Sequence, residues 1–121
     1  MSRRILVVED HEENRRIIRD LLTSAGFEMI EALTGEDGVR LAESERPDLI
    51  LMDIQLPSLD GYEATRRIKA NPALRAIPII AVTSYALSGD EVKAREAGCD
   101  DYVTKPFSPR ALLAKVREHL K

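Results

Sequence analysis

The chain has 121 residues, of which 44% are hydrophobic and 32% charged, and its formal net charge is −3. This length suits one domain with a single core, and the composition is that of a globular protein rather than a disordered or membrane-embedded one. Nucleic-acid binding usually requires a basic face, which the acidic balance does not favour. We therefore expect one domain over residues 1–121 that contacts neither nucleic acid nor membrane.

Cysteine usage and the N-terminus indicate a compartment. Cys99 is the only cysteine, so no internal disulfide can form, and a reduced compartment is the default. The apolar run at residues 5–8 is too short for a signal peptide or a membrane span. We expect a cytoplasmic protein.

The first half of the chain alternates between strand-like and helix-like segments. The predicted elements are a strand at 5–8, a helix at 12–25 ended by Gly26, a strand at 28–32, and a helix capped by Thr34 that runs to about residue 44. The first helix has apolar residues at helical spacing, which predicts an inward face made of Ile17, Ile18, Leu21, Leu22 and Ala25.

The second half repeats the alternation. It begins with an apolar strand at 48–52 and continues with a helix at 61–70 capped by Asp60, a strand at 77–82, a helix that starts near Ser88 and ends at Gly98, a strand at 102–104, and a last helix with Ser108 as cap and Pro109 at its first position. The inward face of that last helix is predicted from Leu112, Leu113, Val116 and Leu120. Arginine pairs occur at 3–4, 15–16 and 66–67, and the two that fall in acid-rich helices predict solvated helix faces.

Five strands that alternate with five helices imply an α/β fold, with a parallel sheet covered by helices on both faces. Ligands of such sheets bind outside the carboxyl ends of the strands. The polar residues that follow the predicted strands are Glu9, Asp10, Asp53, Thr83, Ser84 and Lys105. We expect these groups to converge at one edge of the sheet and to form a site there.

The residue types at this edge favour metal-assisted phosphoryl transfer. Three carboxylates that lie close together repel one another, and a hard divalent cation such as Mg²⁺ relieves that repulsion. His11 and His119 are isolated in the sequence, so no histidine–cysteine cluster predicts zinc. A carboxylate can accept a phosphoryl group, and Lys105 and Thr83 would supply a positive charge and a hydroxyl donor.

The sequence resembles the response-regulator receiver family over essentially its whole length. The resemblance rests on pieces in the expected order: Val8-Glu9-Asp10, Leu51-Met52-Asp53-Ile54-Gln55-Leu56-Pro57, Asp60-Gly61, Val82-Thr83 and Lys105-Pro106. It implies a CheY-like, flavodoxin-like sheet of order 2-1-3-4-5. Within the family, residues 47–57, 89–91 and 98–99 look most like freestanding regulators of the DivK type, and receivers of hybrid histidine kinases share these features.

The resemblance implies roles for single residues. Asp53 would be the phosphoacceptor and a ligand of the metal ion, and Asp10 would bind Mg²⁺ directly, with Mn²⁺ as the alternative ion. Glu9, where many relatives carry aspartate, would help through water, and the backbone carbonyl of Gln55 would complete the coordination. The groups implied to contact the phosphoryl oxygens are Thr83, the backbone N–H of Ser84, and Lys105, which would precede a cis peptide bond to Pro106.

The resemblance also implies how the signal would pass. A histidine kinase or a histidine phosphotransfer protein would donate the phosphoryl group, Thr83 would move toward it, and Tyr102 would turn inward. This would change the surface of the fourth helix, fifth strand and fifth helix, which would bind a protein partner or a second copy of the chain. Gln55 and Tyr85 would set the lifetime of the phosphoryl group. The chain would assist only its own phosphorylation and dephosphorylation rather than act as an enzyme.

The sequence also allows other interpretations of the function and of single residues. A phosphatase of the haloacid-dehalogenase kind would need a second aspartate where Gln55 stands, and a nucleotide-binding or flavodoxin-like module would need a glycine-rich phosphate loop. A degenerate receiver could serve only as a scaffold. Asp48 and Asp60 are rival phosphoacceptors, whereas Glu9 could be a plain surface acid and Lys105 a solvated lysine. Whether the chain is freestanding or part of a longer protein is left open, as is the role of Asn14.

Overall fold

The computed structural model describes residues 2–83 and 90–120, within which five strands alternate with five helices. In chain order they are β1 (Arg4–Val8), α1 (Glu12–Ser24), β2 (Glu28–Ala32), α2 (Gly35–Glu45), β3 (Leu49–Asp53), α3 (Gly61–Ala70), β4 (Ile79–Thr83), α4 (Asp90–Ala97), β5 (Asp101–Thr104) and α5 (Pro109–His119). The predicted alternation is confirmed, with several ends displaced by one or two residues. The predicted cap at Ser88 lies outside the described residues.

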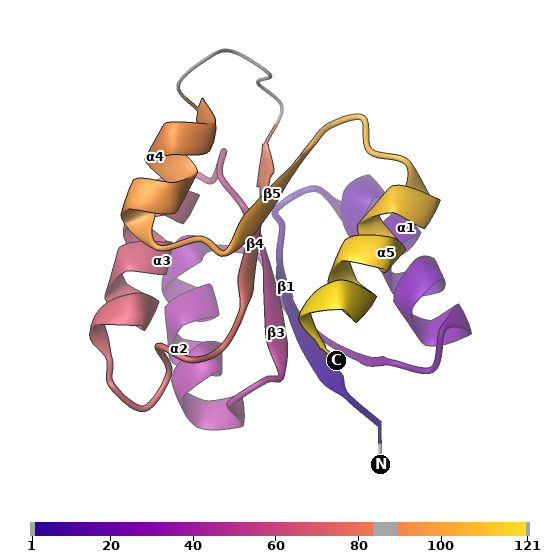
Figure 1. The fold of residues 1–121 in the computed structure, drawn as a ribbon, viewed down its shortest axis with the longest axis horizontal. Coiled ribbons are helices and arrows are strands. Elements are labelled where there is room, and N and C mark those ends of the chain that lie inside the picture. Colours follow the sequence, from indigo (N-terminus) through magenta and orange to yellow (C-terminus); the bar gives the residue numbers. More distant parts are fainter. Residues whose placement is uncertain (1, 84–89, 121) are drawn as a thin grey trace.

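The sheet is parallel and has the predicted order β2-β1-β3-β4-β5. Helices α2, α3 and α4 cover one face, and α1 and α5 cover the other (Figure 1). In the register, Val8 lies opposite Met52, Asp53 opposite Val82, and Thr83 opposite Thr104. The strands therefore end almost level, and the residues at and just beyond these ends meet at one edge.

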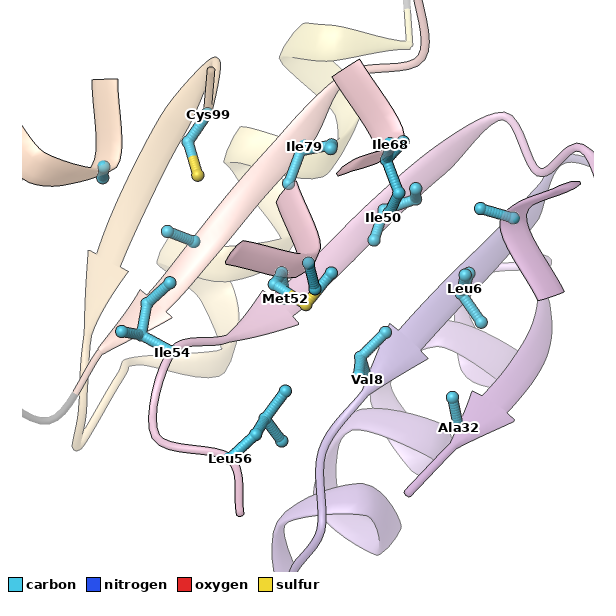
Figure 2. Close-up of a cluster of buried hydrophobic side chains, with 14 of the residues drawn as sticks. Leu6, Val8, Ala32, Ile50, Met52, Ile54, Leu56, Ile68, Ile79 and Cys99 are labelled. Carbon is cyan, nitrogen blue, oxygen red and sulfur yellow. The ribbon is translucent and has the colours of Figure 1, made fainter. Parts of the chain in front are cut away.

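The central strand β3 is buried on both of its faces, which explains why it is apolar throughout until Asp53. Ile50 and Met52 point into the core under α2, α3 and α4, which Figure 2 shows in close-up. Leu49 and Leu51 point into the core under α1 and α5. Asp48 precedes the strand, and its carboxylate accepts a hydrogen bond from the backbone N–H of Arg4 (2.8 Å).

The helix ends are set by the capping residues that the sequence predicted. The side chains of Thr34, Asp60 and Ser108 each accept a hydrogen bond from the backbone N–H three residues later, at 3.1, 2.9 and 3.4 Å. Gly26 and Gly98 follow α1 and α4 with φ of +90° and +109°, a conformation that favours glycine.

Gly61 lets α3 begin directly against the end of β3. A Cβ atom at this position would lie 2.3 Å from the carbonyl oxygen of Asp53 and 2.7 Å from the Cα of Ile54. The backbone N–H of Gly61 donates to the Ile54 carbonyl (3.1 Å). The Asp60-Gly61 pair of the sequence therefore combines a helix cap with a close approach that holds the loop after Asp53.

Two predictions about α1 are wrong. Ile17, expected to face inward, is 49% exposed, and Arg15, expected on a solvated face, is buried. The buried stripe of α1 is Arg15, Ile18 and Leu22, at the i, i+3, i+7 spacing of one helix face, and Ile17 lies beside that stripe. Across residues 2–83 and 90–120, none of the helices has the length and apolar character needed to cross a membrane.

Adjacent isoleucines on α1 provide a matched test of this orientation. Because Ile18 is fully buried, we expect Ile18→Ala to lower the free energy of unfolding by about 2–5 kcal/mol. Ile17→Ala removes the same atoms from a half-exposed position, so its cost should stay below about 1 kcal/mol. Urea unfolding followed by circular dichroism measures both values. Equal costs for the two substitutions would contradict the observed rotation of the helix.

Candidate functional site

Three carboxylates lie together at the carboxyl edge of the sheet. Glu9 and Asp10 follow β1, and Asp53 is the last residue of β3. The side chains of Glu9 and Asp53 are each 2% exposed, and that of Asp10 is 27% exposed. One ligand atom from each of these residues and from His11 falls in a group whose members all lie within 4.8 Å of one another. The predicted convergence is therefore found, with a histidine added to it.

Lys105 brings the positive charge that the sequence predicted. Its Nζ donates to Glu9 Oε1 at 2.8 Å and lies 3.5 Å from Asp53 Oδ1. The side chain is only 16% exposed, so the alternative of a solvated lysine is wrong. The peptide bond from Lys105 to Pro106 is cis, as the family resemblance implied.

Glu9 is buried and accepts hydrogen bonds from several residues, so the alternative of a plain surface acid is also wrong. Besides Lys105, its carboxylate accepts hydrogen bonds from the side chain of Asn14 (3.4 Å) and the backbone N–H of His11 (3.1 Å). Its backbone carbonyl accepts a hydrogen bond from the buried guanidinium of Arg15 (3.0 Å). The role of Asn14, left open by the sequence, includes this contact.

Burial and mutual repulsion shift the proton equilibria of the pocket. Burial, with the charge of Glu9 next in importance, raises the pKa of Asp53 to about 7, against the opposing effects of Lys105 and of the Gln55 backbone N–H (3.2 Å). Burial also raises the pKa of Glu9, but the hydrogen bonds from Lys105 and His11 outweigh it, so this pKa lies below its usual range. Glu9 is therefore the ionised partner of Lys105, and a negative charge on Asp53 is only partly compensated by this lysine.

Two buried oxygens in the pocket find no hydrogen-bond donor among the residues that the structure describes. They are Asp10 Oδ1 and Asp53 Oδ2. Such atoms are costly unless a cation or another donor satisfies them. Carboxylate oxygens are the ligands that Mg²⁺ prefers, and Mg²⁺ usually takes only one or two of them. The residues present therefore fit a divalent metal ion.

A cavity of about 520 Å³ opens onto Asp53 and is lined by His11, Glu12, Glu13, Asn14, Asp53, Gln55 and Lys105. Thr83 is buried at the end of β4, next to β3 in the sheet. Tyr102 is partly buried on β5, and its hydroxyl lies 3.4 Å from Glu91 Oε2 on α4. The predicted phosphate contact at Ser84 and the predicted lifetime residue Tyr85 lie outside the described residues.

The sequence analysis assigned no role in the site to two residues that help to build it. His11, judged isolated, places its Nδ1 3.2 Å from Asp10 Oδ1 and 3.3 Å from Glu9 Oε2. Arg15, judged solvated, supports the backbone of Glu9. The position of His11 directly after the Glu9-Asp10 pair was the one available signal for the histidine. Arg15 gave none, because an arginine in an acid-rich helix normally lies in solvent.

Comparison with known proteins now identifies the family. Residues 5–117 match the response regulator receiver domain. The chain belongs to the response regulator receiver family. The polar-differentiation response regulator DivK of Brucella anthropi is 42% identical over 120 residues, which are 99% of this chain and 98% of DivK.

Solved structures agree with this assignment. The receiver domain of the sensor histidine kinase PA1611 from Pseudomonas aeruginosa, which has a magnesium ion in its active site cleft, superposes with a TM-score of 0.92 at 42% identity and covers 99% of this chain and 98% of its own. The chemotaxis protein CheY4 of Vibrio cholerae superposes with a TM-score of 0.93 at 24% identity, over 99% of this chain and all of CheY4, which shows the shared fold.

The receiver is a phosphorylation-dependent signalling switch of two-component systems. Receivers bind a divalent metal in an acidic pocket, and their family implies a histidine kinase or phosphotransfer partner. Family membership decides against the haloacid-dehalogenase and nucleotide-binding alternatives.

Removing the charge of Asp53 tests the electrostatic description of the pocket. Because its pKa is raised in the fold, Asp53 favours the folded state below about pH 4, and this contribution is lost as the pH rises through about 7. In metal-free buffer at pH 8, Asp53→Asn should therefore raise the free energy of unfolding by on the order of 1–4 kcal/mol. The gain should shrink toward pH 4. Urea unfolding at both pH values measures it.

The control for this experiment is Asp20→Asn, which neutralises an exposed aspartate of α1 and should change stability by less than about 0.5 kcal/mol. Adding Mg²⁺ should stabilise the wild type more than Asp53→Asn, since metal binding to the folded state adds to its stability. A stability difference between wild type and Asp53→Asn that is the same at pH 4 and pH 8 would contradict the raised pKa.

Proposed function

We propose that Asp53 accepts a phosphoryl group from the phosphohistidine of a histidine kinase or histidine phosphotransfer protein, with Mg²⁺ bound beside it. The observation that carries this proposal is the position of the Asp53 carboxylate. It is buried at the end of β3 and lines a cavity. Its Oδ2 has no donor among the described residues, and Lys105 stands 3.5 Å from its Oδ1.

The transfer exchanges one bond for another. An oxygen of the Asp53 carboxylate attacks the phosphorus atom, a phosphorus–oxygen bond forms, and the phosphorus–nitrogen bond to the donor imidazole breaks. The donor histidine keeps the electron pair and regains a proton. Asp10 and Asp53, with Glu9 through water and the Gln55 carbonyl, would hold Mg²⁺, which would neutralise charge on the phosphoryl oxygens. Mn²⁺ offers the same preference for oxygen ligands.

Lys105 and Thr83 complete the proposed phosphate contacts, with the Ser84 backbone N–H as a further donor. Lys105 is hydrogen-bonded to Glu9 and reaches toward Asp53, so a small movement of its ammonium would bring it to a phosphoryl oxygen. Thr83 lies one strand away from Asp53, and a hydroxyl there can donate to a second oxygen.

The same contacts indicate how phosphorylation would change the conformation of the switch. Tyr102 is joined through its hydroxyl to Glu91, so it ties β5 to α4. Movement of Thr83 toward the phosphoryl group would open space on the adjoining strand, and Tyr102 would turn inward and release Glu91. A protein partner that binds one arrangement of the α4, β5 and α5 surface better than the other would then shift the population.

An apolar hollow beside the pocket supports the choice of a protein as donor. A cavity of about 490 Å³ is lined by Asn14, Ile17, Lys105, Pro106, Phe107 and Pro109, and it shares Asn14 and Lys105 with the cavity over Asp53. Ile17 is half-exposed there. A donor that covers this hollow would bring its phosphohistidine to Asp53.

We further propose that residues 1–121 form one receiver domain that acts on no separate substrate and only assists its own phosphorylation and dephosphorylation. Gln55 and Tyr85, the latter outside the described residues, would set the lifetime of the acyl phosphate. Phe107 and Tyr102 line a further hollow on the β5–α5 side, which offers room for an output partner or for homodimerisation.

Acetyl phosphate provides a donor that needs no partner protein. We expect intact-protein mass spectrometry to show one phosphoryl adduct on the wild type, formed only with Mg²⁺ and absent from Asp53→Ala. Asp60→Asn is the matched control, because asparagine also caps a helix and this rival acceptor should not be needed. An adduct that persists in Asp53→Ala and disappears in Asp60→Asn would identify Asp60, the N-cap of α3, as the phosphoacceptor.

Beryllofluoride, which mimics a phosphoryl group on a carboxylate, tests the switch. Its addition with Mg²⁺ should shift backbone amide resonances of α4, β5 and α5 as well as those of the pocket. In Thr83→Ala the shifts should stay near the pocket, because the hydroxyl that draws β4 is missing. Two-dimensional NMR of the labelled chain measures both patterns. Wild-type shifts confined to the pocket would rule out the proposed path.

A further inference from the structure

His11 stands at the mouth of the acidic pocket, at the residue that precedes α1. Its side chain is 67% exposed, and the structure gives it no capping hydrogen bond to the helix within the described residues. Instead the ring turns its Nδ1 toward the carboxylates, 3.2 Å from Asp10 Oδ1 and 3.3 Å from Glu9 Oε2. The imidazole therefore belongs to the pocket rather than to the helix end.

Distances of this size join an imidazole to carboxylates in an ion pair or hydrogen bond, and they also match the separation of two ligands that share a metal ion. Two atoms that each lie about 2.1 Å from one ion, at the angles of octahedral or tetrahedral coordination, are separated by about 3.0–3.4 Å. A second observation points into the same space. Asp53, 2% exposed, has an Oδ2 without a donor among the described residues, and Asp10 Oδ1 has the His11 ring beside it but forms no hydrogen bond within the described part of the chain.

The nitrogen atom changes the class of cation that the pocket can hold. Mg²⁺ is best satisfied by oxygen atoms alone, whereas imidazole suits borderline ions such as Zn²⁺, Ni²⁺ and Co²⁺. We propose that His11 supplies a nitrogen ligand through which the pocket binds a transition-metal ion of the Zn²⁺ class, together with Asp10 and Asp53 and in competition with Mg²⁺.

Lys105 does not block this arrangement. Its ammonium occupies Glu9 Oε1 and approaches Asp53 Oδ1, which leaves Asp53 Oδ2 and Asp10 Oδ1 as the oxygens available to an ion. Because the proposed ion uses the same two oxygens as Mg²⁺, both cannot be bound at once. The competition, but not the binding of Zn²⁺ itself, rests on the proposed function.

Calorimetric titration of the full chain with ZnCl₂ and, separately, with MgCl₂ tests the proposal. We expect His11→Asn to weaken Zn²⁺ binding by about tenfold or more while changing Mg²⁺ binding by less than about twofold. Asparagine is a preferred residue before a helix, so this variant keeps the start of α1. His119→Asn, which removes the only other histidine, paired with Asp101 at 3.1 Å, should leave Zn²⁺ binding unchanged.

Two further readouts make the outcome decisive. In ¹⁵N-detected NMR of the histidine rings, Zn²⁺ should shift the Nδ1 resonance of His11 and leave that of His119 in place. Excess MgCl₂ should reverse the shift. Equal Zn²⁺ affinity of wild type and His11→Asn, or an unmoved His11 resonance, would overturn the proposal. Phosphorylation of His11→Asn by acetyl phosphate with Mg²⁺ separates this failure from a failure of the proposed function, since that reaction needs Asp53 and not His11.

Discussion

Two buried carboxylates, Glu9 and Asp53, share the ammonium of Lys105 at the carboxyl edge of the sheet, and the pocket is organised around this shortage of positive charge. Burial and then the charge of Glu9 raise the pKa of Asp53 to about 7, because Lys105 hydrogen-bonds to Glu9 and only approaches Asp53. Asp53 Oδ2 has no donor among the described residues. A fold selected for stability alone would not keep such a group, because an unpaired buried charge is costly. The cost is explained if a divalent cation and a phosphoryl group complete the site.

The backbone around the pocket holds the carboxylates in place while the charge is incomplete. Asp53 is fixed by the ladder of β3 and by the start of α3, which Gly61 allows to approach the Asp53 carbonyl. Glu9 is fixed through its own carbonyl by the buried guanidinium of Arg15, which also pairs with Glu12 and Glu31. Chemistry that depends on positioning and charge neutralisation benefits from such rigid support.

Around this rigid frame lie the residues that would receive the phosphoryl group and pass on the signal in the proposed function. Tyr102 and Glu91 join β5 to α4 by one hydrogen bond at 3.4 Å, which is weak enough to be exchanged for another contact when the pocket is filled. His11 lines the cavity over Asp53, and Ile17 lines the apolar hollow that adjoins this cavity; both are exposed and would meet a donor protein. In the proposed function, the input and output surfaces therefore flank the same carboxylate.

The amino-acid sequence alone determined the order of the elements, most of their caps, and the residues that follow each strand, because periodicity, capping and strand ends are local properties of the chain. From these the sheet edge, Asp53 and Lys105 could be predicted. Only the tertiary structure decided that Glu9 and Arg15 are buried, that Ile17 is exposed and that His11 turns toward Asp10. The reason is that these outcomes depend on which stripe of a helix another element covers and on contacts between distant segments. The strand ends predicted that Lys105 and Glu9 would reach the same edge, but only the structure shows that Lys105 hydrogen-bonds to Glu9 and stands farther from Asp53.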